Sequence, residues 1–191
     1  MDKQSVPQLF QLFDSIYPMT AGLKAALEQH IELISLHKKD LLIKEGQSVR
    51  YIYFITEGIV RMYYLHDGKE ITTRINKEGD VIFSIDAFYN NSAETVNIEA
   101  VENVQLARLS FDVLSKLFNE FLELNYIARV LSDRYIIDYE RRLHILRKLT
   151  AKEKWQFFCT HYPELSLRVP LIYIAGFLGM NMETLSRARK V

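Results

Sequence analysis

The sequence predicts an α+β protein: an N-terminal β-roll with flanking helices, one long helix, and a C-terminal helix-turn-helix. Short runs of β-branched and aromatic residues separated by glycine turns predict the roll. A stretch without glycine or proline over 121–149 predicts the long helix. Two short amphipathic segments around a glycine predict the helix-turn-helix. We therefore expect the β-roll part over 1–120, the long helix over 121–149 and the helix-turn-helix over 150–191.

The first part of the chain is expected to be helical over 7–37. Its apolar residues recur at spacings of four, four and three, which is typical of an amphipathic helix. These residues are Leu23, Leu27, Ile31 and Ile34.

From Asp40 onward the pattern changes to short strands. Residues 41–47 contain the end of a short strand and a turn, strand-like runs occupy 51–58, 59–65 and 71–75, and two more lie within 96–109, broken at Glu102-Asn103. Asp67-Gly68 separates two of these runs. An Asp-Gly pair is a strong hairpin signal because the turn requires positive φ.

The long helix over 121–149 has apolar positions on a mostly charged background. A helix of this length needs a surface to pack on, and the same helix of a second subunit provides one. We therefore expect a homodimer. The alternative is a helix that packs on its own β-domain.

Residues 171–189 predict two helices joined by a tight turn. Pro170 suits the start of the first helix, Gly179 suits a sharp turn, and Asn181 suits the N-cap of the second helix. Small or apolar residues are expected to face inward: Ala175, Ile174, Leu178, Met180, Leu185 and Ala188. Such a second helix has the size to enter the major groove of DNA. The alternative is a plain helical hairpin with a charged face.

The formal net charge of zero conceals an asymmetry. Residues 1–140 carry 14 basic and 21 acidic side chains, whereas residues 141–191 carry 10 and 3. A basic C-terminal part is what binding to a polyanion requires, although an ordinary solvated surface could have the same charge.

Several classes of protein are disfavoured by what the sequence lacks. It has no long uncharged apolar run and no basic-then-apolar start, so we expect a cytoplasmic protein without a membrane span or signal peptide. Cys159 is the single cysteine, and we expect a buried structural thiol. The five histidines show no ligand spacing, so no metal site and no cofactor are predicted.

The C-terminal pattern resembles the Crp/Fnr superfamily of bacterial transcription regulators, in particular short members from Bacteroidetes-like bacteria. The residues that carry the resemblance are 162–165, 168–170, 173–175, 178–180 and 183–187. The β-rich half, with Glu57-Gly58 and Glu78-Gly79-Asp80, looks like the cyclic-nucleotide-binding jelly roll of that family. The resemblance covers nearly the whole chain.

The resemblance implies a dimeric regulator that binds double-stranded DNA, with RNA polymerase as a candidate partner. Residues matching Glu183 and Arg187 are the usual base readers of the family, and Thr184 and Ser186 match positions that contact phosphates. Met182, Leu171 and Ile172 depart from the pattern. The expected DNA-binding residues are Asn181, Met182, Glu183, Thr184, Ser186, Arg187, Arg189 and Lys190. Because the sequence stops at Val191, we expect a very short or absent β-wing.

The expected effector pocket departs further from the family. A cyclic-nucleotide binder carries Gly-Glu-Leu and then an arginine that neutralises the phosphate. Here 83–86 and 92–95 occupy these places, and a carboxylate replaces the guanidinium. We therefore expect no binding of cAMP in the usual way, and the small-molecule effector is unknown. The residues of this degenerate pocket are Phe83, Ser84, Ile85, Asp86, Ala93, Glu94 and Thr95.

Two other classes of function stay open. One is a ligand-sensing or protein-interaction module with degenerate DNA binding, which Leu171, Ile172 and Met182 favour. The other is an enzyme that uses Asp86 and Glu94 as paired carboxylates. No phosphate-binding glycine loop, HExxH motif or nucleophile elbow is present, so no catalytic residue is predicted. An iron–sulfur variant of the family would need several cysteines.

Overall fold

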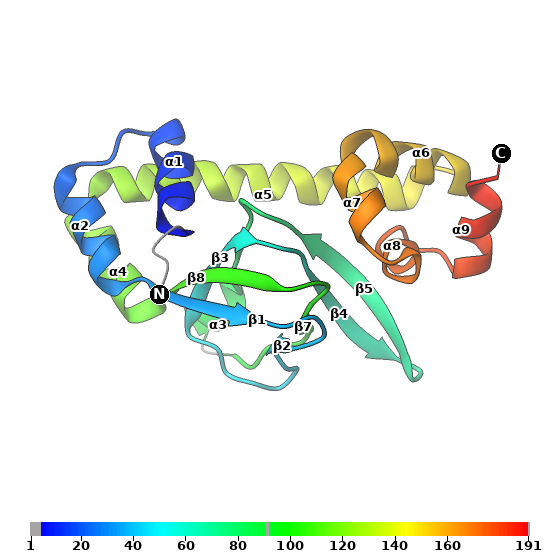
Figure 1. Cartoon of the computed structure of the whole chain (residues 1–191), viewed down its shortest axis with the longest axis horizontal. Helices are drawn as coiled ribbons and strands as arrows, with labels where there is room; N and C mark the ends of the chain where they lie inside the picture. The colour runs from blue at the N-terminus through cyan, green and yellow to red at the C-terminus, as the bar shows by residue number, and fades with distance from the viewer. Residues whose placement is uncertain (1–4, 91, 191) are drawn as a thin grey trace. The chain divides into compact units, whose positions relative to one another are not determined.

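A computed structural model describes residues 5–90 and 92–190, except for the side chains of Ser5, Ile85 and Phe88 (Figure 1). The architecture is α+β, as predicted. The helices are α1 (Ser5–Ile16), α2 (Ala21–His30), α3 (Ile85–Asn90), α4 (Phe111–Glu120), α5 (Leu122–Lys148), α6 (Ala151–His161), α7 (Pro163–Arg168), α8 (Leu171–Phe177) and α9 (Met182–Ala188). The strands are β1 (Glu32–Leu36), β2 (Leu41–Ile43), β3 (Tyr51–Glu57), β4 (Val60–His66), β5 (Lys69–Asn76), β6 (Val81–Ile82), β7 (Asn97–Ala100) and β8 (Val104–Ser110).

The strands form two four-stranded sheets, ordered β1-β8-β3-β6 and β2-β7-β4-β5. In the first sheet β8 pairs antiparallel with both neighbours, so that Leu106 lies opposite Ile34 on one side and Ile55 on the other. Leu106 and Ile55 are fully buried. This arrangement confirms the predicted β-roll.

The hairpin between β4 and β5 turns at Asp67-Gly68, as the sequence predicts. Both residues have positive φ, 49° at Asp67 and 71° at Gly68. Two successive residues with positive φ match the right-handed twist of the flanking strands, which is why this turn joins them tightly (Figure 1).

The prediction of helix over 7–37 is wrong at its end. Helix α2 stops at His30, and Glu32–Leu36 forms strand β1 instead. Ile31 and Ile34 fit a helical spacing with Leu23 and Leu27, but the backbone after Ile31 pairs with β8. The pairing of β1 with β8 outweighs the local helical periodicity. This periodicity involves only neighbouring residues, so it carries no information about a partner strand far along the chain.

By its contacts the chain divides into two compact units. The first contains residues up to 60 together with 76–133, and the second contains 61–75 together with the residues from 134 onward. The β4–β5 hairpin thus groups with the C-terminal helices. The division of the chain after residues 120 and 149 that the sequence suggests stays a prediction about functional parts.

The core of the first unit is apolar and involves α2, β8, α4 and the start of α5. Its fully or nearly fully buried members are Leu23, Leu27, Leu109, Leu114, Leu117, Leu124 and Ile127. Thr20 and Ser110 begin α2 and α4 by accepting hydrogen bonds from the backbone N–H groups of Leu23 and Val113. Such caps satisfy donors that a helix start leaves unpaired.

Candidate nucleic-acid interface

Helices α8 and α9 form the predicted helix-turn-helix. Between them Gly179 has a φ of 64°, and the Met180 N–H donates to the Ala175 carbonyl at 2.9 Å. Asn181 caps α9, because its Oδ1 accepts from the Thr184 N–H at 2.8 Å. Pro170 is the N-cap residue of α8 rather than a residue of its first turn.

The buried face of this motif also agrees with the prediction. Ile174 and Leu185 have no exposed surface, and Ala175 and Leu178 are each 1% exposed. Met180 is half-buried. The small side chain of Ala175 allows the two helices to approach closely, and α9 packs on both α8 and α6.

The outward face of α9 carries the predicted DNA-contacting residues. Those with exposed side chains are Asn181, Glu183, Ser186, Arg187, Arg189 and Lys190, whereas Met182 and Thr184 are half-buried. The Arg189 guanidinium lies 5.2 Å from the centre of the Trp155 ring on α6. Arg189 is therefore partly engaged with the protein, while Glu183 and Arg187 face solvent.

An aromatic cluster packs α6 and the residue that follows it against α8. The Phe158 and Phe177 ring centres are 5.7 Å apart in an edge-to-face arrangement, and Tyr162 meets Phe177 in the same way at 6.1 Å. Edge-to-face packing is a preferred geometry for aromatic pairs. The Tyr162 hydroxyl donates to Asp138 at 3.0 Å, and burial raises the pKa of Tyr162.

Two residues at this junction were not anticipated from the sequence. Arg142 of α5 lies 4.6 Å from the centre of the Phe177 ring and donates to the Phe177 carbonyl at 3.4 Å. Burial and the nearby Arg74 lower the pKa of Arg142. Arg61 of β4 contacts Tyr173 of α8. The sequence gives one signal for Arg61, an arginine within an apolar strand. Its partner Tyr173 lies more than a hundred residues away in sequence, so this signal does not reveal the contact.

The predicted effector-pocket segments place two carboxylates near each other. Asp86 accepts from Asn90 Nδ2 at 2.7 Å and Ser92 Oγ at 2.5 Å, and these bonds lower its pKa. Glu94 is 8% exposed, and burial raises its pKa, to which the charge of Asp86 adds.

The other predicted pocket residues play lesser parts. Ser84 Oγ accepts from the Ala87 N–H at 3.2 Å, at the start of α3, and Ser84 also bonds Glu94. Ala93 and Thr95 are exposed, Phe83 is half-buried, and the side chain of Ile85 lies outside the described residues. Segment 83–95 contains no arginine or lysine. Its local charge is negative, which disfavours a phosphate.

The described residues contain neither a candidate membrane span nor a candidate metal site. No helix among them is both long and apolar enough to cross a membrane. No group of three or more histidine, cysteine, aspartate or glutamate side chains in residues 5–90 and 92–190 could hold a metal ion. Cys159 is a free thiol that is half-buried rather than buried, and burial raises its pKa.

Comparison with known proteins links these features to a family. A model described as "Cyclic nucleotide-binding domain" matches residues 33–121. Regulatory protein HlyX of Actinobacillus pleuropneumoniae is 26% identical over 165 residues, which cover 80% of this chain and 68% of that protein. An anaerobic regulatory protein of Haemophilus influenzae is 27% identical over 165 residues, covering 80% and 63%. These relatives are regulatory proteins, and the match spans about two thirds of their length.

Solved structures show the same fold. FixK2 from Bradyrhizobium japonicum superposes with a TM-score of 0.73 at 20% identity, covering 84% of this chain and 83% of that one. CLP from Xanthomonas campestris, described as a c-di-GMP-responsive global regulator, gives 0.67 at 19% identity and covers 90% of each chain.

Proposed function

We propose that the chain is a transcriptional regulator of the Crp/Fnr type that binds a specific sequence in double-stranded DNA as a homodimer. The observation that carries the proposal is the geometry of α9. One face of this helix is packed through Leu185, its start is capped by Asn181, and its other face presents Glu183 and Arg187 to solvent. This is the arrangement by which a recognition helix enters the major groove.

The side chains on this face suit different parts of DNA. Arg187 can donate two hydrogen bonds to guanine, and Glu183 can accept from cytosine. Ser186 and Lys190 are exposed beside them and suit phosphate oxygens. Base contacts specify the sequence, whereas phosphate contacts set the register, so replacing Arg187 should alter specificity more than replacing Lys190.

Apolar side chains exposed on α5 support the homodimer. Ile136 and Ile137 are 53% and 55% exposed, and Tyr139 is 51% exposed. A cluster of this kind on a long helix favours a second copy of the same helix, since burial removes apolar surface from water. A dimer would present two α9 helices to half-sites about one helical turn, roughly 34 Å, apart.

We further propose that cAMP is not the effector. A cyclic nucleotide needs a cation for its phosphate, whereas Asp86 and the buried Glu94 supply negative charge. Titration calorimetry with cAMP should give no binding heat at micromolar concentrations. Micromolar affinity would refute this part of the proposal. We also propose that the regulator acts in the cytoplasm, with RNA polymerase as a candidate protein partner.

The decisive experiment is selection from random double-stranded DNA with the purified protein. A two-fold symmetric motif of one to two helical turns is the expected result. A variant with Glu183 and Arg187 both replaced by alanine should enrich no motif, and Lys152→Ala, an exposed change outside α9, should enrich the same motif as the unmodified protein. An unmodified protein that enriches no motif would contradict the proposal.

One observation favours a second candidate, a ligand-sensing or protein-interaction module with degenerate DNA binding. Leu167 on α7 and Ile172 on α8 are 88% and 56% exposed, which is unusual for apolar residues near a polyanion. This candidate predicts weak, sequence-indifferent binding that falls steeply with salt. The same selection therefore distinguishes the two functions.

A further inference from the structure

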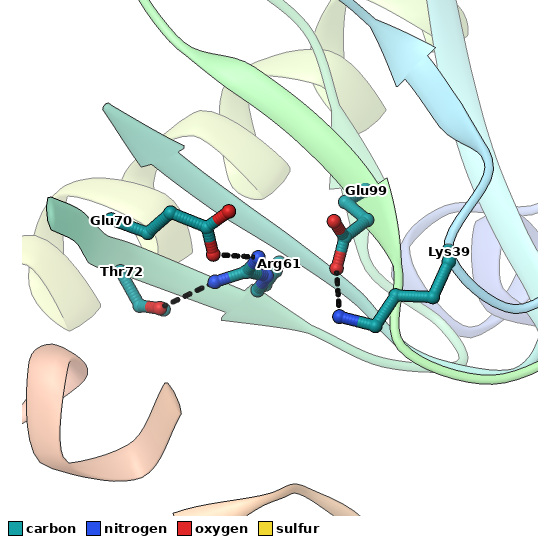
Figure 2. Close-up of polar contacts among 5 residues, drawn as sticks. All are labelled: Lys39, Arg61, Glu70, Thr72 and Glu99. Atoms are coloured by element: carbon teal, nitrogen blue, oxygen red, sulfur yellow. Dashed lines mark hydrogen bonds and ion pairs between the residues drawn. The ribbon is translucent and has the colours of Figure 1, made fainter. Parts of the chain in front are cut away.

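Arg61 of β4 is a buried cation on the β4–β5 hairpin. Its side chain is 1% exposed. The guanidinium forms an ion pair with Glu70 and donates to Thr72 Oγ1 at 3.5 Å, both on β5 (Figure 2). A buried guanidinium is tolerated only where partners replace the water that it loses.

The same guanidinium lies between two aromatic rings. Its central carbon is 4.2 Å from the centre of the Tyr63 ring and 3.7 Å from that of Tyr173. Tyr63 belongs to the hairpin, but Tyr173 belongs to α8 and is 8% exposed. Arginine suits this position because its flat cation stacks on rings, and the attraction is strongest away from water. Arg61 thus joins the hairpin to the first helix of the helix-turn-helix.

A second contact, independent of charge, lies one helical turn further along α8. A Cβ atom at Gly176 would lie 3.0 Å from the Thr72 backbone nitrogen and 3.3 Å from Thr72 Cβ. The backbones of α8 and β5 are therefore in direct contact, and a larger residue at 176 would have to push them apart.

These contacts leave the DNA-reading face uncovered. The hairpin touches α8 at Tyr173 and Gly176, whereas Glu183 and Arg187 of α9 remain exposed. A contact that masked these residues would inhibit DNA binding. A contact on α8 that leaves Glu183 and Arg187 exposed instead fixes the position of α8 and, through it, the position of α9.

We propose that Arg61 is a positioning residue for DNA binding, acting through a contact that we name the Arg61 latch: Arg61, Glu70, Thr72, Tyr173 and Gly176. The latch holds α8 on the β4–β5 hairpin, so that α9 has one orientation instead of several. When only a fraction of molecules has the competent orientation, the apparent affinity falls by that fraction. The inference rests on the proposed DNA-binding function.

The first test compares Arg61→Met with Lys69→Met. Both changes remove one positive charge from the hairpin, but Lys69 is exposed. Hydrogen exchange of α8, measured without DNA, should be roughly tenfold faster in Arg61→Met and unchanged in Lys69→Met. Exchange in β3 and β8 of the other unit should stay at the rate of the unmodified protein, which excludes global unfolding. Unchanged exchange of α8 in Arg61→Met would overturn the latch.

The second test measures affinity for the selected DNA. Arg61→Met should bind about tenfold more weakly with an unchanged salt slope, because orientation is lost and no phosphate contact is lost. Unchanged affinity, or a shallower slope, would overturn the positioning role.

Gly176→Ala keeps the proposal testable if Arg61→Met does not fold. This change separates α8 from β5 without changing charge. We expect the same faster hydrogen exchange of α8 and the same weaker binding to the selected DNA. Normal exchange of α8 in this variant would count against the latch. If the unmodified protein selects no DNA, the DNA function fails and the positioning role with it, while the exchange measurement still decides whether Arg61 holds α8.

Discussion

Gly179 provides a direct test of how the turn of the helix-turn-helix is held. Its φ of 64° lies in the left-handed region, and a Cβ there would lie 3.0 Å from Leu146 Cδ2. For Gly179→Ala the left-handed backbone costs roughly 1–2 kcal/mol. The contact adds up to about 1 kcal/mol, because the Leu146 methyl must leave its preferred rotamer. We therefore expect a loss of about 2 kcal/mol in the free energy of unfolding.

The assay is urea unfolding followed by the fluorescence of Trp155, the single tryptophan of the chain. Trp155 lies on α6 with its ring stacked on Phe158, so its signal reports on the unit that contains Gly179. A loss of about 2 kcal/mol should lower the urea midpoint by roughly 1 M.

Gly68→Ala is the matched control. Gly68 has a φ of 71°, but nothing lies within 4 Å of its Cβ position. Gly68→Ala should therefore carry the cost of the left-handed backbone without the steric contact. Its urea midpoint should fall by less than that of Gly179→Ala. Gly179→Asn should fall between the unmodified protein and Gly179→Ala, since asparagine tolerates the left-handed region. An unchanged midpoint for Gly179→Ala would refute the reasoning.

Three further predictions follow from the other sites. Arg187→Ala should weaken binding to the selected DNA by about 1–3 kcal/mol and relax one base position in a fluorescence-anisotropy titration; Lys152→Ala, which removes the same charge elsewhere, should not relax it. Replacing Ile136 and Ile137 together by glutamate should give monomers in sedimentation experiments, because each buried isoleucine contributes about 1.5–3 kcal/mol; a persistent dimer would contradict the α5 interface. Burial raises the pKa of Glu94, so ionised Glu94 destabilises the fold once pH rises above the ordinary carboxyl range. Glu94→Gln should therefore raise the melting temperature at about pH 7 and have no effect at about pH 4; equal effects at both would contradict this account.

The features predicted best from the sequence are those set by neighbours along the chain. Asp67-Gly68 requires positive φ wherever it joins two strands, and the structure has both angles positive. Asn181 and Gly179 likewise act through their own backbone or the next turn. The local chemistry of such positions is the same in any fold, so a sequence pattern is sufficient to place them.

The features that the sequence did not reveal depend on distant partners. Strand β1 was mistaken for helix because its pairing strand, β8, lies some seventy residues further along the chain. The contact of Arg61 with Tyr173 has no periodic signature at all. In the predicted pocket the charge of Glu94 could be read from the sequence, but its burial could not.

The grouping of residues 61–75 with the C-terminal helices has a consequence for building chimeras. A helix-turn-helix head exchanged between relatives at a junction near Thr150 would leave its hairpin behind. The transplanted α8 would then meet a foreign strand where Gly176 now contacts Thr72. Modular exchange should succeed only when the hairpin and the head come from the same parent, because the portable unit is discontinuous in sequence.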